Sequence, residues 1–347
     1  MSKPKSKLSD YALNIPETDY HARKTLSYSI LARYEREGGF SSLPKRFDDL
    51  WEPTPKTDAL LFGSAFDTAV TRGMDAFNKE FVVFDGETPA DKARDVIAAL
   101  VERGIAWEDT SGIVSVMNDL RYYPTWKDVT RISKMSEGGA AAYYRALRKA
   151  KDDGLSIISA EMRDMVVHKL DVLRATPLTN SLIFDELPEG QERYFQLQFE
   201  SNVNDVVYKI MCDMIIVDHN NKSIHIYDLK TSGKESSEFR RSYLDWNYHI
   251  QSHLYRMVLL HALMFTDYED YTVDEFSFIV VSKVNDTPLV WGDDTLVEEE
   301  RPRLRNPITI GTELMGAYEL SPTEPNQLIR KDVPDTVSAS SPNSLHF

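Results

Sequence analysis

The segment from Ile210 to Gly233 constrains the fold of this chain more than any other. It reads IMCDMIIVDHNNKSIHIYDLKTSG, which is two apolar stretches separated by a polar one centred on an Asn-Asn pair. This pattern predicts an antiparallel hairpin with residues 218–222 as its loop. The first strand is apolar except for Asp213, and a carboxylate in a buried strand is costly unless something compensates its charge. We therefore expect a compensating group beside Asp213.

The register of the hairpin predicts which groups lie there. Counting inward from the loop places Asp213 opposite Tyr227, one position from Asp228. Facing residues lie about 5 Å apart, so two carboxylates in these strands can share one cation. Asp228 and Lys230 are two positions apart on a strand and project from the same face. Two acids and an ammonium at one end of a sheet are typical of a Mg²⁺ or Mn²⁺ site that binds phosphate. The alternative is a solvated salt bridge.

Composition limits the classes of protein to which the chain can belong. Its 347 residues are 42% hydrophobic, enough for one large globular domain or two. No apolar run reaches the length of a membrane span, and no apolar segment follows the N-terminal lysines as a secretory signal requires. The single cysteine, Cys212, excludes an internal disulfide and a four-cysteine zinc or iron-sulfur cluster. We expect a cytoplasmic protein without a membrane partner.

The charge is negative overall but unevenly distributed. A net charge of -15 argues against broad nonspecific binding to nucleic acid. Acidic residues gather at 293–300, whereas basic residues gather on one expected helix at 145–151 and after the hairpin, at Lys234, Arg240 and Arg241. These clusters allow a local basic path for DNA, although such clusters are usually solvated faces.

Helices are predicted before the hairpin. We expect a flexible N-terminus at 1–17, then helices from Ser27 to the glycine pair near 39, at 57–71 and at 159–176. Helical tendency also covers 88–151, broken at Pro124. A group of aromatic residues in that stretch either stacks on bases or forms core. Its members are Tyr122, Tyr123, Trp126, Tyr143 and Tyr144.

Around and after the hairpin the pattern predicts a sheet. Residues 191–200 alternate apolar and polar, which indicates a strand with one wet face that completes a three-stranded meander. A long helix at 239–265, a strand at 275–281 and weaker helix to about 318 follow, and 321–347 has the composition of a disordered tail. The fold class expected is α+β (α/β), with a central mixed sheet containing the antiparallel meander and flanked by helices. We expect one domain at 18–320, made of a helical portion at 18–185, a sheet and helix at 186–285 and an extension at 286–320.

The order of these motifs resembles the PD-(D/E)xK nuclease superfamily. An acid, an Asp-x-Lys and a Gln-x-x-x-Tyr stand on successive strand, strand and helix, in MCDMIIVD, IYDLKTSG and QSHLY. The chain looks closest to the RecB/RecE branch, the exonuclease VIII-like proteins of phages and prophages. YHARKTLSYSIL, LLFGSAFDTAV and ATPLTNSLI are similar to further segments of that branch, and together the matches span about 20–260. The resemblance implies a restriction-endonuclease-like core.

The resemblance also implies roles for individual residues. Asp213 and Asp228 would bind the metal with the backbone carbonyl of Leu229, and Lys230 would position the attacking water. Gln251 and Tyr255 would support the site and touch the DNA backbone, with Lys234, Arg240 and Arg241 as further DNA contacts. Glu192 would act as an additional catalytic acid or metal ligand, with Glu161 a weaker candidate.

The chain departs from the family at Asp67, where relatives commonly have His. An acid there can still ligate a metal but cannot act as a neutral imidazole ligand.

The function implied is a Mg²⁺-dependent deoxyribonuclease, with Mn²⁺ as a substitute and no iron-sulfur cluster. A RecE-like exonuclease would hydrolyse one strand from duplex DNA ends during phage recombination, in the host cytoplasm. The family further suggests a single-strand annealing partner and a ring-shaped homo-oligomer. Two alternatives remain at this point: a structure-specific endonuclease with the same core, and a DNA-end-binding protein whose catalytic site has decayed.

Overall fold

A central sheet of mixed strand directions organises the structure. The computed structural model describes residues 6–38, 57–292 and 306–319. The strands stand in the order β3 (Gln191–Val203), β4 (Val206–Asp218), β5 (Ser223–Ser232), β6 (Thr272–Ser282) and β7 (Leu289–Gly292). The pairs β3·β4, β4·β5 and β6·β7 are antiparallel, and β5·β6 is parallel. The predicted fold class, a mixed sheet that contains an antiparallel meander, is confirmed.

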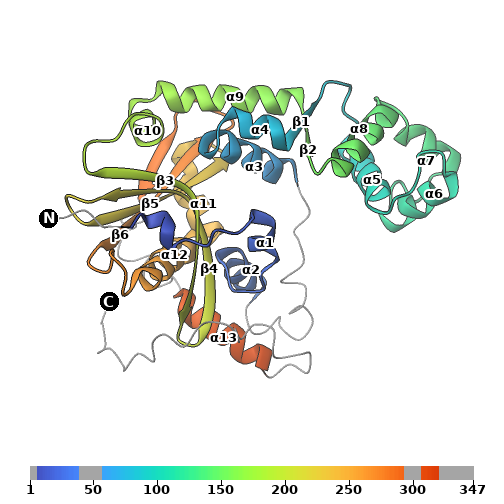
Figure 1. Cartoon of the computed structure of the whole chain (residues 1–347). Helices are drawn as coiled ribbons and strands as arrows, with labels where there is room; N and C mark the ends of the chain where they lie inside the picture. The colour runs from blue at the N-terminus through green and yellow to red at the C-terminus, as the bar shows by residue number, and fades with distance from the viewer. Residues whose placement is uncertain (1–5, 39–56, 293–305, 320–347) are drawn as a thin grey trace.

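Helices cover both faces of this sheet, so that the core of the molecule has three layers (Figure 1). On one face lie η1 (Leu8–Tyr11), α2 (Tyr28–Arg36), α11 (Phe239–Asp245), α12 (Tyr248–Leu263) and α13 (Pro307–Glu319). On the other lie α3 (Asp58–Thr71), α4 (Met74–Glu80), α9 (Ala160–Ala175) and α10 (Pro177–Ile183). The strands are therefore apolar on both sides, which explains the near-continuous apolar run of β4. No helix in the described ranges has the length and apolarity needed to cross a membrane.

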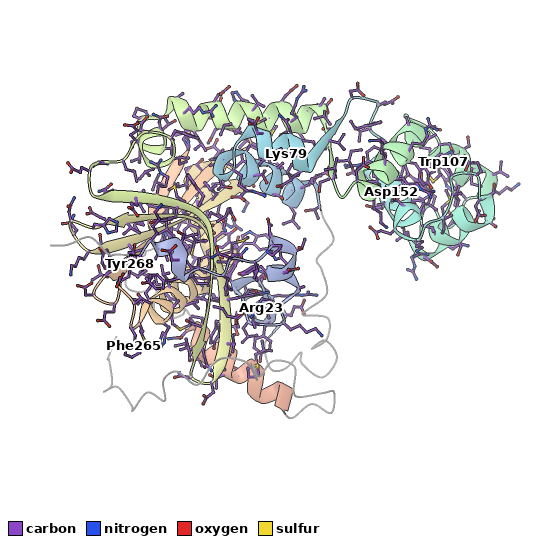
Figure 2. All side chains as sticks on the ribbon, viewed as in Figure 1. Arg23, Lys79, Trp107, Asp152, Phe265 and Tyr268 are labelled. Carbon is purple, nitrogen blue, oxygen red and sulfur yellow. The ribbon has the colours of Figure 1, made fainter. Side chains whose placement is uncertain are left out.

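Lys209 attaches the N-terminal segment to the sheet. Its ammonium donates to the backbone carbonyls of Tyr20 and Arg23, which flank the end of α1 (Glu17–Ala22), at 2.7 and 2.6 Å. Arg23 in turn forms two hydrogen bonds of 2.8 and 2.9 Å with Glu200 of β3. These buried polar contacts fix the segment YHARK against β3 and β4, on the side of the sheet where Figure 2 labels Arg23.

Four helices form a lobe outside the three layers. They are α5 (Asp91–Glu102), α6 (Thr110–Asp119), α7 (Asp128–Met135) and α8 (Ala140–Asp152), and they enclose a hydrophobic cluster of their own. The lobe connects to the rest through β1 (Phe81–Phe84) and β2 (Ser156–Ser159), which pair in parallel. Figures 1 and 2 show the lobe projecting beyond α3 and α4, with Trp107 and Asp152 inside it.

The hairpin has a shorter loop than the sequence indicated. Asp218 pairs with Ser223 and Met214 with Tyr227, so the predicted pairing of Asp213 with Tyr227 is wrong by one residue. The cause is local: an Asp218 carboxylate oxygen accepts hydrogen bonds from the backbone N–H groups of Asn220 and Asn221 at 2.8 and 3.1 Å. This Asx turn closes the chain within four residues. Continued by one residue, this register puts Asp213 level with Asp228 rather than with Tyr227.

Other boundaries also differ from the expected ones. The helix expected at 239–265 is two helices, because Asn247 adopts a left-handed conformation with φ 57° after Trp246. The short strand β7 was not predicted. Residues 6–17, expected to be flexible, pack against the core, where Leu8 is fully buried. The expected tail at 321–347 and the acidic stretch at 293–300 lie outside the described residues.

Strand β3 changes face in its middle. Phe195 packs with the helices α3 and α9, but Leu197 and Phe199 pack with α12, although all three would share a face in a regular strand. Gln196 causes the change, because its φ of 53° lies in the left-handed region. The predicted wet face is accordingly wrong: Gln198 is 7% exposed and the Glu200 side chain 1%.

Two helical glycines allow a test of this packing. A Cβ added to Gly63 of α3 would lie 3.5 Å from the hydroxyl of Thr231 in β5, an ordinary contact. A Cβ added to Gly311 of α13 would overlap the hydroxyl of the fully buried Tyr208. We expect Gly63→Ala to stabilise the protein by roughly 0.5 to 1 kcal/mol through helix propensity. Gly311→Ala should destabilise it by about 1 to 3 kcal/mol through overpacking. Urea unfolding of both variants measures the difference, and equal effects would contradict the packing described.

Candidate metal-binding active site

Asp228 is the centre of the candidate site. It lies on β5, is 3% exposed, and its carboxylate is bound on both oxygens. The ammonium of Lys230, two residues along the same strand, donates to Oδ2, and the side-chain amide of Gln251 donates to Oδ1 at 2.6 Å. Gln251 is on α12, so the carboxylate joins the strand to the helix that covers it. The expected approach of Asp228, Lys230 and Gln251 is observed.

Lys230 is held between the carboxylate and aromatic rings. Its ammonium lies 4.9 Å from the ring centroid of Tyr248 and 5.7 Å from that of Phe278. Burial lowers the pKa of Lys230, but the neighbouring Asp228 and Tyr248 outweigh burial, and the pKa lies above its ordinary value. Lys230 therefore carries a full positive charge at neutral pH. A charged amine fixed in this way suits electrostatic stabilisation rather than general-base chemistry.

Asp213 stands where β4 and β5 part. The pairing of the two strands ends at Met214 and Tyr227, and one residue further the Asp213 carboxylate accepts a hydrogen bond of 2.7 Å from the backbone N–H of Leu229. Burial, then the charges of Asp228 and Asp67, raise the pKa of Asp213 well above its ordinary value. The structure thus places a second acid, Asp213, beside Asp228, and the two negative charges repel each other.

Asp67 of α3 is the third acid of the group. Both of its oxygens accept from the side-chain amide of Gln196, at 3.1 and 2.9 Å. Burial and the charge of Asp228 raise the pKa of Asp67 to about 7, against the lowering effect of Arg72. The position at which the chain departs from the resembled family therefore lies within electrostatic reach of the other two acids.

Gln196 was not among the predicted site residues. In the β3·β4 register it falls between the pairs Leu197 with Cys212 and Phe195 with Met214, which puts it opposite Asp213. Its left-handed backbone turns the amide towards α3. The Asn204-Asp205 pair joins β3 to β4 in a two-residue turn, and counting inward from it places Gln196 beside Asp213, so the signal was present in the sequence.

The donor set suits a divalent cation. Three carboxylates, Asp67, Asp213 and Asp228, interact through their charges, and the ammonium of Lys230 compensates only part of that negative charge. Buried negative charge in excess of its partners is costly, and oxygen ligands of this kind are those that Mg²⁺ and Mn²⁺ prefer. Among the described residues, no group of three or more His, Cys, Asp or Glu side chains is already arranged to hold a metal ion. Lys230 and Gln251 engage Asp228 instead.

Two predicted acids lie elsewhere. Glu192 pairs with Val217, four positions along β3 from Gln196, or about 13 Å at the usual rise of a strand. It accepts a hydrogen bond from Tyr194 and lies 3.5 Å from His219, so the structure does not bring it to Asp213. Glu161 lines a cavity of about 390 Å³ beside the lobe, whose lining includes none of the three clustered acids. Regular strand geometry from Glu192 to Phe195 accounts for the separation.

The predicted DNA contacts divide by exposure. Gln251 is 2% and Tyr255 is 9% exposed, and Tyr255 packs edge-on against Phe276 at 5.7 Å. Gln251 binds Asp228 from α12, whereas a supporting role for Tyr255 stays a prediction. The burial of both residues contradicts a direct contact with a DNA backbone. The other three predicted contacts, Lys234, Arg240 and Arg241, are exposed beyond the end of β5. Their role in binding DNA and that of the Leu229 carbonyl stay predictions.

Comparisons with known proteins assign no family. No family model matches the chain, and no curated protein matches it. Among solved structures, the chain is similar to the "Putative exonuclease" from Eubacterium rectale, with 13% sequence identity, a TM-score of 0.44 and 88% of each chain covered. This likeness is too remote to transfer residues or an activity, so the site is interpreted from its own geometry.

The raised pKa of Asp67 gives a stability test in EDTA. Asp67 holds its proton up to about pH 7 in the folded protein but releases it near 3.8 when unfolded. Between these values the unfolded chain binds fewer protons, so this residue lowers stability as the pH rises. The loss is at most about 4 kcal/mol, at 1.36 kcal/mol per pKa unit.

Asp67→Asn keeps an oxygen for Gln196 but cannot ionise. We expect this variant to gain stability over the wild type between about pH 5 and pH 8, measured by urea unfolding at both values. Asp171→Asn, on the exposed face of α9, is the matched control and should follow the wild type. A parallel pH dependence of wild type and Asp67→Asn would contradict the burial of this carboxylate.

Proposed function

We propose that the protein is a metal-dependent nuclease that hydrolyses phosphodiester bonds in DNA. One observation carries the proposal: where β4 and β5 part, Asp213 lies within electrostatic reach of Asp228, and the Lys230 ammonium is bound to Asp228. Two acids and a fixed amine at one sheet end suit metal-assisted hydrolysis of a phosphodiester. The order of these residues, which resembles the PD-(D/E)xK superfamily, supports the same conclusion.

The residues present define separate tasks. Asp213 and Asp228, with Asp67 beside them, would hold a divalent cation, which when bound neutralises the phosphate and lowers the pKa of a water molecule. Lys230 would stabilise the negative charge that develops on the phosphate oxygens. Gln251 fixes the orientation of the Asp228 carboxylate from α12, and Gln196 fixes that of Asp67 from β3. The Leu229 N–H holds Asp213 in place.

The more specific form of the proposal is an exonuclease that degrades one strand from duplex ends. It is supported by segments that resemble those of RecE-like proteins, including YHARK, which Lys209 and Glu200 anchor to β4 and β3. A role in phage recombination with an annealing partner is part of the same proposal. A closed circular duplex separates this activity from an endonuclease, since only the latter cuts a substrate without ends.

Activity on linear duplex DNA provides the direct test. We expect degradation with Mg²⁺ or Mn²⁺ and none with EDTA. Asp228→Asn and Lys230→Met should each reduce the rate by at least about 10²-fold, because each removes charge from the reacting centre. Release of acid-soluble nucleotides from a labelled duplex measures the rate.

The matched control for these variants is Asp171→Asn, which should retain wild-type activity. Wild-type protein that binds DNA ends but is inert with both metals would replace the proposal with the end-binding alternative. Unchanged activity in Asp228→Asn would exclude this site as the catalyst.

Metal binding is tested without activity. A ligand that binds only the folded state stabilises it by about 2.7 kcal/mol at a concentration 100 times its dissociation constant. We expect Mn²⁺ to raise the thermal midpoint of the wild type and not that of Asp213→Asn, which loses a charged ligand but keeps an acceptor for the Leu229 N–H. In EDTA, Asp213→Asn should be at least as stable as the wild type, since it removes repulsion from Asp228. Equal stabilisation of both proteins by Mn²⁺ would refute the assignment.

A further inference from the structure

The aromatic residues of the helical lobe divide into a buried and an exposed set. Tyr122 and Tyr144 are each 4% exposed and belong to the lobe core. Trp126, in the loop between α6 and α7, is 42% exposed, and Tyr123 lies half-buried between Trp126 and the core. The question that the sequence left open, whether these rings form core or contact bases, thus has a different answer for each ring.

Tyr123 and Trp126 form a fixed stack at the surface. Their ring centroids are 4.5 Å apart with planes inclined by 17°. Tyr122 packs edge-on against Tyr123 at 4.8 Å and 79°, which connects the stack to the core. The ammonium of Lys92 lies 5.3 Å from the centroid of the Tyr123 ring. The Tyr123 ring therefore packs against one face of the Trp126 indole and holds it in a fixed orientation at the surface.

The backbone of this loop adopts a costly conformation. Arg121 and Tyr123 have φ values of 51° and 43°, in the left-handed region that side-chain-bearing residues rarely enter. The loop is held there by hydrogen bonds from the backbone N–H of Tyr122 to Met117 at 2.8 Å and from that of Trp126 to Tyr123 at 3.0 Å. Backbone conformations of this kind gather at binding and catalytic sites.

The charges around the stack favour an anionic ligand. Three carboxylates on the elements that flank the loop are paired: Asp119 with Arg103 at 2.5 Å, Asp128 with Arg131, and Glu137 with Lys134 at 2.7 Å. In the part of the chain that the structure describes, Lys92, Arg121 and Lys127 form no ion pair and are exposed. The loop therefore carries local positive charge on a chain of net charge -15.

We propose that the loop at 120–127 binds single-stranded DNA, with an unpaired base stacked on Trp126 and the phosphates beside Lys92, Arg121 and Lys127. Aromatic platforms with flanking cations bind single strands because every base has a π-face. A duplex conceals those faces, so the ligand is the unpaired strand. The proposal rests on the proposed nuclease function, in which digestion of one strand leaves the other unpaired. The lobe that carries this loop projects away from the sheet (Figure 1).

Binding by the full-length protein in EDTA tests this proposal without cleavage. Fluorescence anisotropy would compare a labelled oligo(dT), an abasic strand of equal length and a blunt duplex. We expect Trp126→Ala to weaken oligo(dT) binding about tenfold and leave abasic binding unchanged, since only stacking is lost. Trp126→Phe should restore most of the affinity. Lys127→Gln should weaken both single strands and reduce the salt dependence by about one unit of slope.

Val129→Ala is the matched control, because Val129 is 81% exposed on the adjacent helix α7 and carries no ring. It should bind like the wild type. Equal oligo(dT) binding by wild type and Trp126→Ala, or no binding by either, would overturn the proposal. A change in oligomeric mass of Trp126→Ala without loss of DNA binding would also overturn it and assign the loop to contacts between copies of the chain. Absence of Mg²⁺-dependent cleavage would refute the nuclease proposal alone, because the binding assay contains no metal.

Discussion

The buried carboxylate of Asp228 is the constraint on which the site depends. Removing a charge from water is tolerated only when donors replace the water, and here the donors come from two different elements. Lys230 supplies one from the same strand, and Gln251 supplies the other from α12. The carboxylate therefore links α12 to the sheet, in addition to the apolar packing of that helix. The parallel pairing of β5 with β6, which carries Phe278 beneath Lys230, supports the same arrangement.

The negative charge of Asp67, Asp213 and Asp228 exceeds the positive charge that Lys230 supplies. Asp67 and Asp213 have raised pKa values because burial and mutual repulsion both disfavour their ionised forms. A fold that needed only stability would place apolar or amide side chains at these positions. Buried acids with perturbed pKa values gather at functional sites, and this supports the proposal that the cluster binds a cation.

The sequence predicted the sheet and the convergence of Asp213, Asp228 and Lys230, because strand periodicity and hairpin pairing depend on local rules. It missed the loop length by one residue, since the Asx turn of Asp218 competes with other closures of similar cost. It also missed Gln196, whose left-handed backbone breaks the alternation that the prediction assumed. The prediction that Glu192 joins the site was wrong for the opposite reason. Its strand runs regularly from 192 to 195, and this keeps Glu192 four positions along β3 from Gln196, the residue beside Asp213. The sequence also left open which aromatic rings of the helical lobe are exposed, because helical spacing does not determine how the four helices pack against one another.

The two strands β1 and β2 have a mechanical consequence for the lobe. A connection of one segment would let the lobe twist freely. Here two segments, β1 and β2, are hydrogen-bonded in parallel along Phe81–Phe84, and the paired strands resist both twisting and bending of the lobe. A pull applied at the tip of the lobe is therefore transmitted to α4, which precedes β1, and to α9, which follows β2. α9 packs on the same side of the sheet as α3, the helix that carries Asp67. A force on the lobe is therefore passed through β1 and β2 to helices that lie beside Asp67.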